Sequence, residues 1–192
     1  MPGSEHETVK VEFDGQIERI EPMIDGSAIQ ARVRELGAEI REAFAGEELV
    51  VVGVLKGAFL FFADLVQAID LPLMSCDFLG LSSYGSRTES SGVVRLTSDL
   101  SQSIHGKHVL IVEDIVDTGL TMNYLLNNFK SRSPASVSIC TLLDKPAGRK
   151  VEVDVQYTGF VIEDKFVVGY GLDFDERHRQ LPFIGVMHFD PL

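Results

Sequence analysis

Apolar positions along the chain follow two spacings, which together predict alternating helices and strands. Over residues 29–44 the apolar side chains recur every three or four positions, which is typical of an amphipathic helix, and Gly46 ends it. Residues 49–54 are continuously apolar and rich in β-branched side chains, as buried parallel strands are. A helical composition returns over residues 58–69. The first third of the chain therefore predicts a helix followed by a strand–loop–helix unit.

The alternation continues to residue 168, whereas the first residues carry no such pattern and are expected to be frayed. Residues 82–92 contain a single aromatic and no aliphatic side chain, which predicts a mobile hairpin loop between two strands. Residues 121–130 are expected to form a helix. The further strands are expected at residues 74–81, 93–96, 108–112, 137–143, 153–157, 160–162 and 166–168. Strands alternating with helices predict an α/β fold with a mostly parallel twisted sheet flanked by helices on both faces.

Composition and charge narrow the classes of function. A chain of 192 residues, 45% hydrophobic and 24% charged, fits a single globular domain over residues 1–192. Seventeen basic and 29 acidic residues give a net charge of −12, which disfavours binding to nucleic acid or an anionic membrane. The N-terminus lacks the apolar core of a signal peptide, and Lys56 interrupts the longest apolar run. We therefore expect a cytoplasmic protein that contacts neither membrane nor nucleic acid.

The cysteines and histidines suggest no metal site. Cys76 and Cys140 lie far apart in apolar stretches, without a Cys-x-x-Cys spacing, so both are expected to be buried free thiols in a reducing compartment. The five histidines show no metal-binding spacing beyond a possible pair at residues 105 and 108, and we expect them to be structural or exposed.

Two adjacent carboxylates follow the apolar strand at residues 108–112. Paired carboxylates just beyond the carboxyl end of a strand, such as Glu113 and Asp114, can accept hydrogen bonds from the vicinal hydroxyls of a sugar or help to hold a hydrated Mg²⁺. The alternative is that the pair is simply a solvated strand end.

The next segment, Asp-Thr-Gly-Leu-Thr at residues 117–121, leads into the expected helix. A turn with Gly119 at a helix N-terminus points free backbone N–H groups outwards, and the hydroxyls of Thr118 and Thr121 add donors. The turn is therefore suited to one phosphate, although Asp117 alone would pass for an ordinary helix cap. A phosphate beside a ribose is the interpretation that explains both features.

Four hydrophobic residues, two acids, two hydrophobic residues and Asp-Thr-Gly-x-Thr together resemble the phosphoribosyl diphosphate (PRPP) signature of type I phosphoribosyltransferases. From residue 50 almost to the C-terminus the chain resembles hypoxanthine-guanine phosphoribosyltransferases, and bacterial ones most closely. Five motifs in the family's order carry the resemblance: residues 55–57, 82–85, 113–121, 142–145 and 164–170, the last followed by Leu172 and Asp173. The resemblance implies the α/β fold above, with a small hood formed by the chain ends and a mobile hairpin loop.

The activity that the resemblance implies is purine salvage. The enzyme would transfer 5-phosphoribosyl from PRPP to hypoxanthine or guanine, with Mg²⁺, and release IMP or GMP and diphosphate. A homodimer or homotetramer would be usual for the family.

The resemblance also implies which residues bind PRPP. Glu113 and Asp114 would hold the ribose and Mg²⁺, and Asp117 would take the proton from purine N7. The 5′-phosphate turn would comprise Asp117, Thr118, Gly119, Leu120 and Thr121, with leucine where vertebrate relatives carry lysine. The diphosphate would be bound by Leu55, Lys56, Gly57 and Arg179, with Asp173 as a ligand of a second Mg²⁺. Arg177 is expected to be solvated, and the peptide before Lys56 is one that relatives can hold in the cis form.

On the purine side, the resemblance places the ammonium of Lys145 on the exocyclic O6. A lysine only donates hydrogen bonds, so it suits a 6-oxopurine and is mismatched to the amino group of adenine. Phe166 would stack on the base and Val167 would supply backbone contacts, while Lys165 either contacts the base edge or is solvated. Ser83 and Tyr84 would belong to a lid that closes over PRPP and excludes water.

Two other functions stay open at this point. A transcriptional or RNA-binding regulator can keep this fold and the PRPP signature, although the acidic charge disfavours it. A xanthine or xanthine-guanine enzyme would share almost every residue named above, so the sequence leaves the preference among 6-oxopurines undecided.

Overall fold

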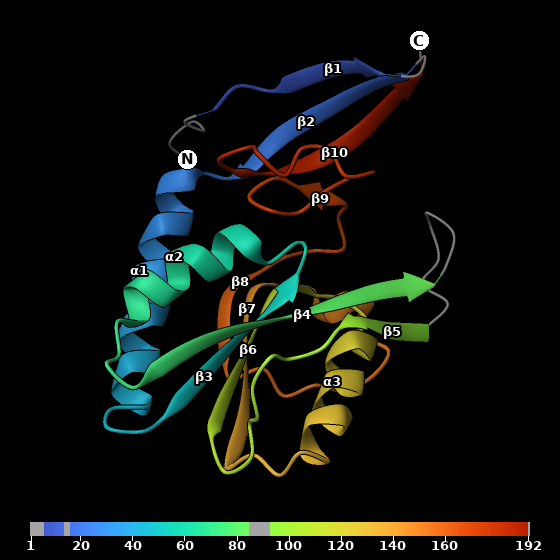
Figure 1. The fold of residues 1–192 in the computed structure, drawn as a ribbon. Coiled ribbons are helices and arrows are strands. Elements are labelled where there is room, and N and C mark those ends of the chain that lie inside the picture. The colour runs from blue at the N-terminus through green and yellow to red at the C-terminus, as the bar shows by residue number, and fades with distance from the viewer. Residues whose placement is uncertain (1–5, 14–15, 85–92, 192) are drawn as a thin grey trace.

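The computed structural model describes residues 6–13, 16–84 and 93–191, which form two sheets and three α-helices (Figure 1). The helices are α1 (Gly26–Ala43), α2 (Phe59–Ile69) and α3 (Leu120–Lys130), with one 3-10 turn at Pro146–Gly148. The strands are β1 (Val9–Phe13), β2 (Gln16–Ile24), β3 (Leu49–Leu55), β4 (Met74–Tyr84), β5 (Val93–Ser98), β6 (His108–Val116), β7 (Ser136–Asp144), β8 (Tyr157–Val161), β9 (Val167–Val168) and β10 (Ile184–Pro191).

The larger sheet has the strand order β5-β4-β3-β6-β7-β8. The strands from β4 to β8 are parallel, and β5 returns antiparallel to β4 as a hairpin. Because successive side chains of a strand point to opposite faces, β3 contributes to two cores. Leu49 and Val51 pack with α1 and α2, while Val50 and Val52 pack with α3. The continuous apolar run is explained by this double burial, and the predicted fold class is confirmed.

Helices α1 and α2 pack closely on one face of this sheet. The amphipathic pattern of α1 buries its predicted apolar stripe, including Ile29, Val33 and Leu36. Gly37 permits the close approach, since a Cβ there would lie 2.5 Å from the Cβ of Ala68 on α2. The α2 helix starts just after residues 55–57, at the carboxyl end of β3.

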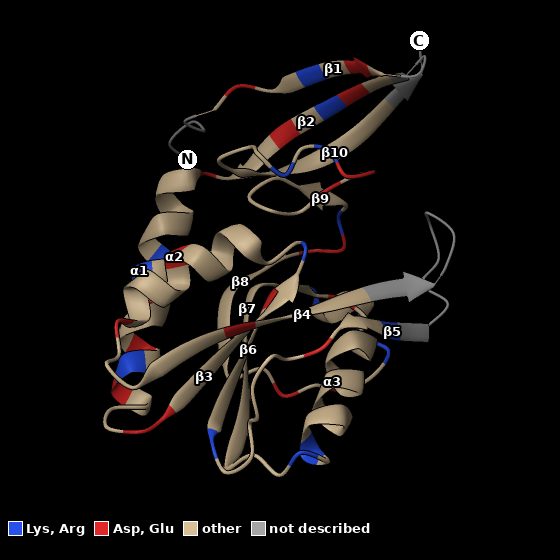
Figure 2. Ribbon diagram, in the orientation of Figure 1, with Lys and Arg blue, Asp and Glu red and all other residues tan. Residues whose placement is uncertain are grey.

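The smaller sheet, which we call the hood, is formed by β1, β2, β10 and β9 in that order. It joins the two ends of the chain above the larger sheet (Figure 1). The residue pattern predicted no strand before residue 49 or after residue 168, where β1, β2 and β10 lie. Both signs of charge interrupt β2 (Figure 2), so it lacks the apolar run that marks a core strand. The hood implied by the family resemblance is present, whereas the hairpin joins the larger sheet.

Several predicted strands differ in extent. Residues 153–156 are not a strand, because Val153 and Val155 pack against the α3 core instead of pairing with a neighbour. The strand predicted at 160–162 is the end of β8, and that predicted at 166–168 is reduced to the two residues of β9.

The two cysteines are free, but only Cys140 is buried. The expectation of a buried Cys76 is wrong because β4 pairs with β5 only from Gly80 onwards. Asp77 and Leu79 point into the protein, so the side chain of Cys76 points to the opposite face of β4. No strand pairs with this outer edge of β4 at Cys76, and the thiol is exposed. Among the residues that the structure describes, no helix is both long and apolar enough to cross a membrane.

Candidate functional site

The paired carboxylates lie inside β6 rather than beyond its end, which corrects the sequence-based expectation. Pairing with β7 continues past them, with Glu113 opposite Thr141 and Val116 opposite Asp144. The strand therefore carries Glu113 into a buried position, 8% exposed, at the carboxyl end of the parallel sheet. This is the edge at which open α/β sheets usually bind their ligands.

Burial controls the charge of this pair. Loss of solvent raises the pKa of Glu113 well above its ordinary value, and the neighbouring charge of Asp114 raises it further. Burial also raises the pKa of Asp114, although a hydrogen bond from Glu113 and the N–H of Ile115 oppose that rise. The pair therefore retains a proton on Glu113 more readily than separate carboxyls would. Glu113 Oε2 is buried without a hydrogen-bond partner among the described residues, so it has capacity for a ligand group.

The turn after β3 touches this pair directly. A Cβ added to Gly57 would lie 1.6 Å from Asp114 Oδ2, so only glycine fits there without displacing the carboxylate. The peptide bond between Leu55 and Lys56 is cis. The contact between Gly57 and Asp114 brings the predicted diphosphate loop and the predicted ribose carboxylates into one site.

The turn at residues 117–121 has the geometry expected of an anion site. Gly119 adopts a left-handed conformation, with φ of 80°, immediately before α3 begins. The Thr118 carbonyl accepts hydrogen bonds from the N–H groups of Lys150 at 2.9 Å and Val151 at 3.1 Å, which hold the turn from outside. A cavity of about 310 Å³ opens beside it, lined by residues 113–119, Thr121 and Met122. The N–H of Leu120 donates a long 3.4 Å hydrogen bond to Thr118 Oγ1, and the N-terminus of α3 faces this cavity, where it can meet a phosphate.

Arg149 supports this turn, and the sequence analysis missed it. Its guanidinium donates a 3.0 Å hydrogen bond to the carbonyl of Asp117 and forms an ion pair with Asp144. Arg149 lies just after the 142–145 motif, but a single arginine in a polar stretch carries no periodic signal. The nearby Gly148 is also constrained, since a Cβ there would lie 1.9 Å from Asp117 Oδ1.

Lys145, at the end of β7, is buried at 7% exposure with its ammonium in the site. Its Nζ lies 2.8 Å from Asp164 Oδ1 and 3.4 Å from Asp117 Oδ2. Asp164 belongs to a motif that the sequence analysis used, but its partnership with Lys145 was not foreseen. Two carboxylates therefore surround the cation on which the choice of purine was predicted to depend.

The predicted base-binding residues lie around a second cavity of about 230 Å³, lined by Asp114, Ile115, Asp117, Lys145, Lys165, Phe166, Val167, Leu172 and Asp173. Phe166 is half exposed, and its ring meets that of Phe174 edge to face with 5.8 Å between centroids. Val167 is buried in β9, while the exposed Lys165 forms a 2.9 Å ion pair with Glu163. A flat apolar ligand can therefore reach Phe166, whereas plain core packing would have hidden it.

The predicted diphosphate cations meet at a carboxylate that the sequence analysis missed. Glu176 accepts a 2.9 Å hydrogen bond from Lys56 Nζ through one oxygen and another of 2.9 Å from Arg179 through the other. These two cations lower the pKa of Glu176. Arg179 also donates to the Gly171 carbonyl at 2.7 Å and pairs with Asp173 at 2.9 Å. The structure thus brings Lys56 and Arg179, 123 positions apart in the numbering, to one side of the site.

Three further expectations have different outcomes. Arg177 is not solvated: it pairs with the buried Glu18 at 2.5 Å and stacks on the ring of Phe13. Ser83 and Tyr84 lie at the end of β4, and their side chains, like residues 85–92 of the predicted lid, lie outside what the structure describes. Among the described residues, no three His, Cys, Asp or Glu side chains are grouped to hold a metal ion.

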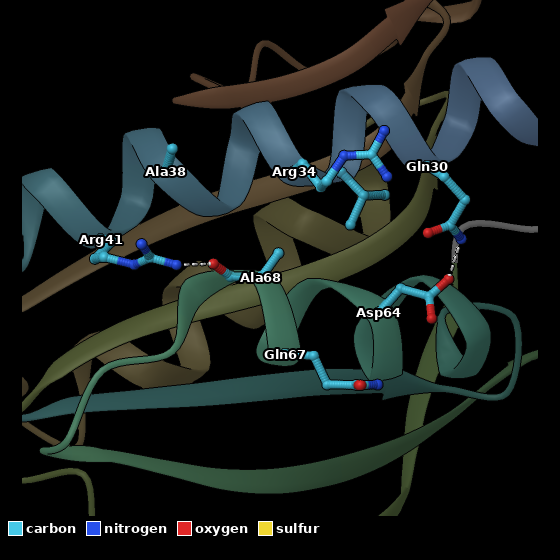
Figure 3. Close-up of a pocket in the computed structure, with 8 residues that line it drawn as sticks. Gln30, Arg34, Ala38, Arg41, Asp64, Gln67 and Ala68 are labelled. Atoms are coloured by element: carbon cyan, nitrogen blue, oxygen red, sulfur yellow. Dashed lines mark hydrogen bonds between the residues drawn. The ribbon is translucent and has the colours of Figure 1, made fainter.

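Another cavity, of about 500 Å³, lies between α1 and α2 (Figure 3). None of the predicted site residues lines it. Its polar groups bond to one another: Gln30 donates to Asp64 at 2.5 Å, and Arg41 donates to the carbonyl of Ala68 at 2.6 Å. Asp64 also accepts a 2.5 Å hydrogen bond from the hydroxyl of Tyr170, in the segment that leads to Asp173. This cavity therefore lies outside the candidate site, and its only link to the site among these contacts is the bond between Asp64 and Tyr170.

Known proteins resemble this chain in both sequence and fold. Residues 23–175 match the family model for the phosphoribosyl transferase domain. The chain belongs to the phosphoribosyltransferase family. It is an α/β phosphoribosyltransferase, and its relatives are similar over most of its length.

A hypoxanthine-guanine phosphoribosyltransferase from Mycobacterium avium is 50% identical over 181 residues, covering 91% of this chain and 88% of that protein. A bifunctional protein TilS/HprT from Listeria monocytogenes is 48% identical, and the match covers 86% of this chain but only 25% of that longer protein. A crystal structure of a hypoxanthine phosphoribosyltransferase from Staphylococcus aureus superposes with a TM-score of 0.83 and 45% identity, covering 88% of this chain and 91% of that one.

Proposed function

We propose that this phosphoribosyltransferase transfers the 5-phosphoribosyl group of PRPP to hypoxanthine or guanine and yields IMP or GMP and diphosphate. The observation that carries the proposal is the wall shared by the two site cavities, which both include Asp114, Ile115 and Asp117. A ribose at this wall would have its phosphate in one cavity and its base in the other. The relatives from Mycobacterium avium and Staphylococcus aureus carry hypoxanthine, or hypoxanthine and guanine, in their names, which supports the same purine bases.

On the PRPP side, we assign the backbone N–H groups of residues 117–121 to the 5′-phosphate. The orphaned Glu113 oxygen and the Asp114 carboxylate would accept hydrogen bonds from the ribose hydroxyls. Lys56 and Arg179 already face a shared carboxylate, Glu176, so a diphosphate can take over the same donors. Charge develops on the diphosphate as the bond to the ribose breaks, and prearranged cations stabilise that charge.

The carboxylates also fit Mg²⁺, which proteins often hold through one or two carboxylates together with substrate phosphates. Glu113 and Asp114 would hold one ion beside the ribose, because the orphaned Glu113 Oε2 is available for it. We assign a second ion to Asp173, whose carboxylate already bonds Arg179 and the N–H of Glu176. When bound, Mg²⁺ neutralises charge on the departing diphosphate.

On the base side, we assign Lys145 to the O6 of a 6-oxopurine and Phe166 to stacking on the ring. Asp164, 2.8 Å from the Lys145 ammonium, would keep that donor aimed into the cavity. Asp117 would accept the proton of purine N7, since it lines both cavities beside the ribose. Val167 and Lys165 complete this assignment through backbone contacts and the base edge.

The remaining assignments concern the protein as a whole. We assign the role of a lid that excludes water to Ser83, Tyr84 and the loop that follows them. We also propose that residues 1–192 act as one domain, that the enzyme works in the cytoplasm, and that it assembles as a homodimer or homotetramer.

The test is an assay of nucleotide formation from PRPP with hypoxanthine, guanine, xanthine and adenine offered separately, with and without Mg²⁺. We expect Mg²⁺-dependent turnover of hypoxanthine or guanine, with adenine refused. Turnover of adenine would refute the assignment of Lys145, and turnover of xanthine alone would favour the xanthine enzyme. Binding of PRPP without turnover of any base would refute the proposed function and favour a regulator.

A further inference from the structure

We propose that Glu18, on strand β2 of the hood, is a positioning residue for the diphosphate side of the site. It would act through Arg177 and His178, which precede Arg179 in the chain. This inference rests on the proposed function, because it concerns how Arg179 is held toward the diphosphate of PRPP.

The Glu18 carboxylate lies between two neighbouring side chains of the site segment. Its side chain is only 3% exposed, and Oε1 accepts a 2.5 Å hydrogen bond from Arg177 Nη2. Its other oxygen, Oε2, lies 2.7 Å from Nε2 of His178, whose side chain is 6% exposed. Removing a partner from a buried carboxylate leaves an uncompensated charge and strongly destabilises the folded protein. Glu18, Arg177 and His178 therefore hold one another in place.

Arg177 depends on this carboxylate and on an aromatic ring of the hood. Its guanidinium carbon lies 3.6 Å from the ring centroid of Phe13 on β1, a cation–π distance. Its Nε and Nη1 atoms are buried without a hydrogen-bond partner in the described part of the chain. The bond to Glu18 therefore supplies the polar contact that fixes the orientation of this guanidinium, and both N-terminal strands of the hood take part.

The four residues from 176 to 179 divide between two environments. Glu176 and Arg179 bond to each other beside Lys56, whereas Arg177 and His178 bond to the hood. The backbone is left-handed at Glu176, with φ of 63°, and at His178, with φ of 72°. Such conformations are unfavourable for residues other than glycine and persist when surrounding contacts enforce them. Glu18 supplies an enforcing contact, and the position of Arg179 follows from it.

The experiment compares Glu18→Gln with Glu21→Gln, a matched change on the same strand at a side chain that is 60% exposed. Binding of magnesium diphosphate and of IMP is measured separately by calorimetry, together with kcat and the KM for PRPP. Glu18→Gln is expected to raise the diphosphate Kd and the KM for PRPP about tenfold, as for residues that act through a packed network. The IMP Kd should change less than about twofold, because IMP lacks the diphosphate that is assigned to Arg179, whereas kcat should fall, because Arg179 is assigned to the charge of the departing diphosphate.

Arg177→Lys gives a second route if Glu18→Gln does not fold, because it keeps the charge beside Glu18 but loses the planar fork. Arg177→Lys should raise the diphosphate Kd, as Glu18→Gln does. An unchanged diphosphate Kd in both variants would overturn the proposal, and so would an equal loss of diphosphate and IMP binding, which would indicate general damage to the hood. If the unmodified enzyme turns over no purine, the proposed function fails, whereas the diphosphate comparison still decides the role of Glu18.

Discussion

Replacing Gly57 by alanine tests whether the diphosphate loop and the ribose carboxylates form one rigid site. The new Cβ would lie 1.6 Å from Asp114 Oδ2, and ordinary contact begins near 3.4 Å, so the carboxylate or the loop must move apart by more than an ångström. Asp114 cannot move freely, because its other oxygen accepts a 2.8 Å hydrogen bond from the N–H of Ile115. A displacement of about 1 Å at reacting groups can cost about 100-fold in rate.

We therefore expect Gly57→Ala to lower kcat/KM for PRPP about 100-fold and the free energy of unfolding by about 1–3 kcal/mol, the usual cost of overpacking. Both are measured, the first by initial rates and the second by urea unfolding. The control is Gly46→Ala, where a Cβ meets nothing within 4 Å but φ is 85°. It should lose about 1–2 kcal/mol of stability through backbone strain and keep its activity. The reasoning is refuted if Gly57→Ala retains kcat/KM within threefold, or if Gly46→Ala loses activity as well.

Three further predictions concern single side chains. Asp117→Asn should bind IMP normally but turn over about 10²–10⁴-fold more slowly, as loss of a general base predicts; unaltered kcat would remove Asp117 from that role. Asp164→Asn should raise the KM for hypoxanthine and spare the KM for PRPP, because Asp164 contacts Lys145 on the base side alone; an equal rise in both would contradict this. Native protein should expose one thiol to a disulfide reagent, Cys76, and denatured protein two. Burial raises the pKa of both thiols, and the reactive thiolate therefore forms only at higher pH than in a free cysteine; labelling of Cys140 in the native state would be inconsistent with its burial.

The parts of the fold that the sequence predicted are those in which one local pattern has one solution. Residues 49–54 are apolar on both faces because β3 is covered by helices on both sides. The amphipathic stripe of α1 likewise needs only its own spacing. The hood escaped the pattern because β2 carries charges and because its partner, β10, lies at the other end of the chain. The pattern of a short segment does not show pairing with a strand so far away in the chain.

The candidate site divides in a similar way. The phosphate turn and the carboxylate pair are contiguous in sequence, so the chemistry of residues 113–121 could be read directly. Arg149 and Glu176 contribute through contacts with distant residues, Asp117 and Lys56, and neither belongs to a periodic or spaced pattern. Arg177 was expected to be solvated for the same reason, since nothing near it in the sequence indicates the buried Glu18.

The pairing of the hood also bears on the order in which the enzyme assembles. Ile20 pairs with Met187, so the central pair of hood strands closes nearly the whole chain. Closing a flexible loop of roughly 160 residues costs about 4–5 kcal/mol in chain entropy, which the hood can offset only after the strands between them have folded. The parallel pairs of the larger sheet close shorter loops, since Leu49 of β3 pairs with His108 of β6 and His108 pairs with Ser136 of β7, so each pair costs less chain entropy. During refolding, amides of β3 and β6 should therefore become protected from hydrogen exchange before turnover returns, because Phe166 and Val167 reach their places only with the last strands.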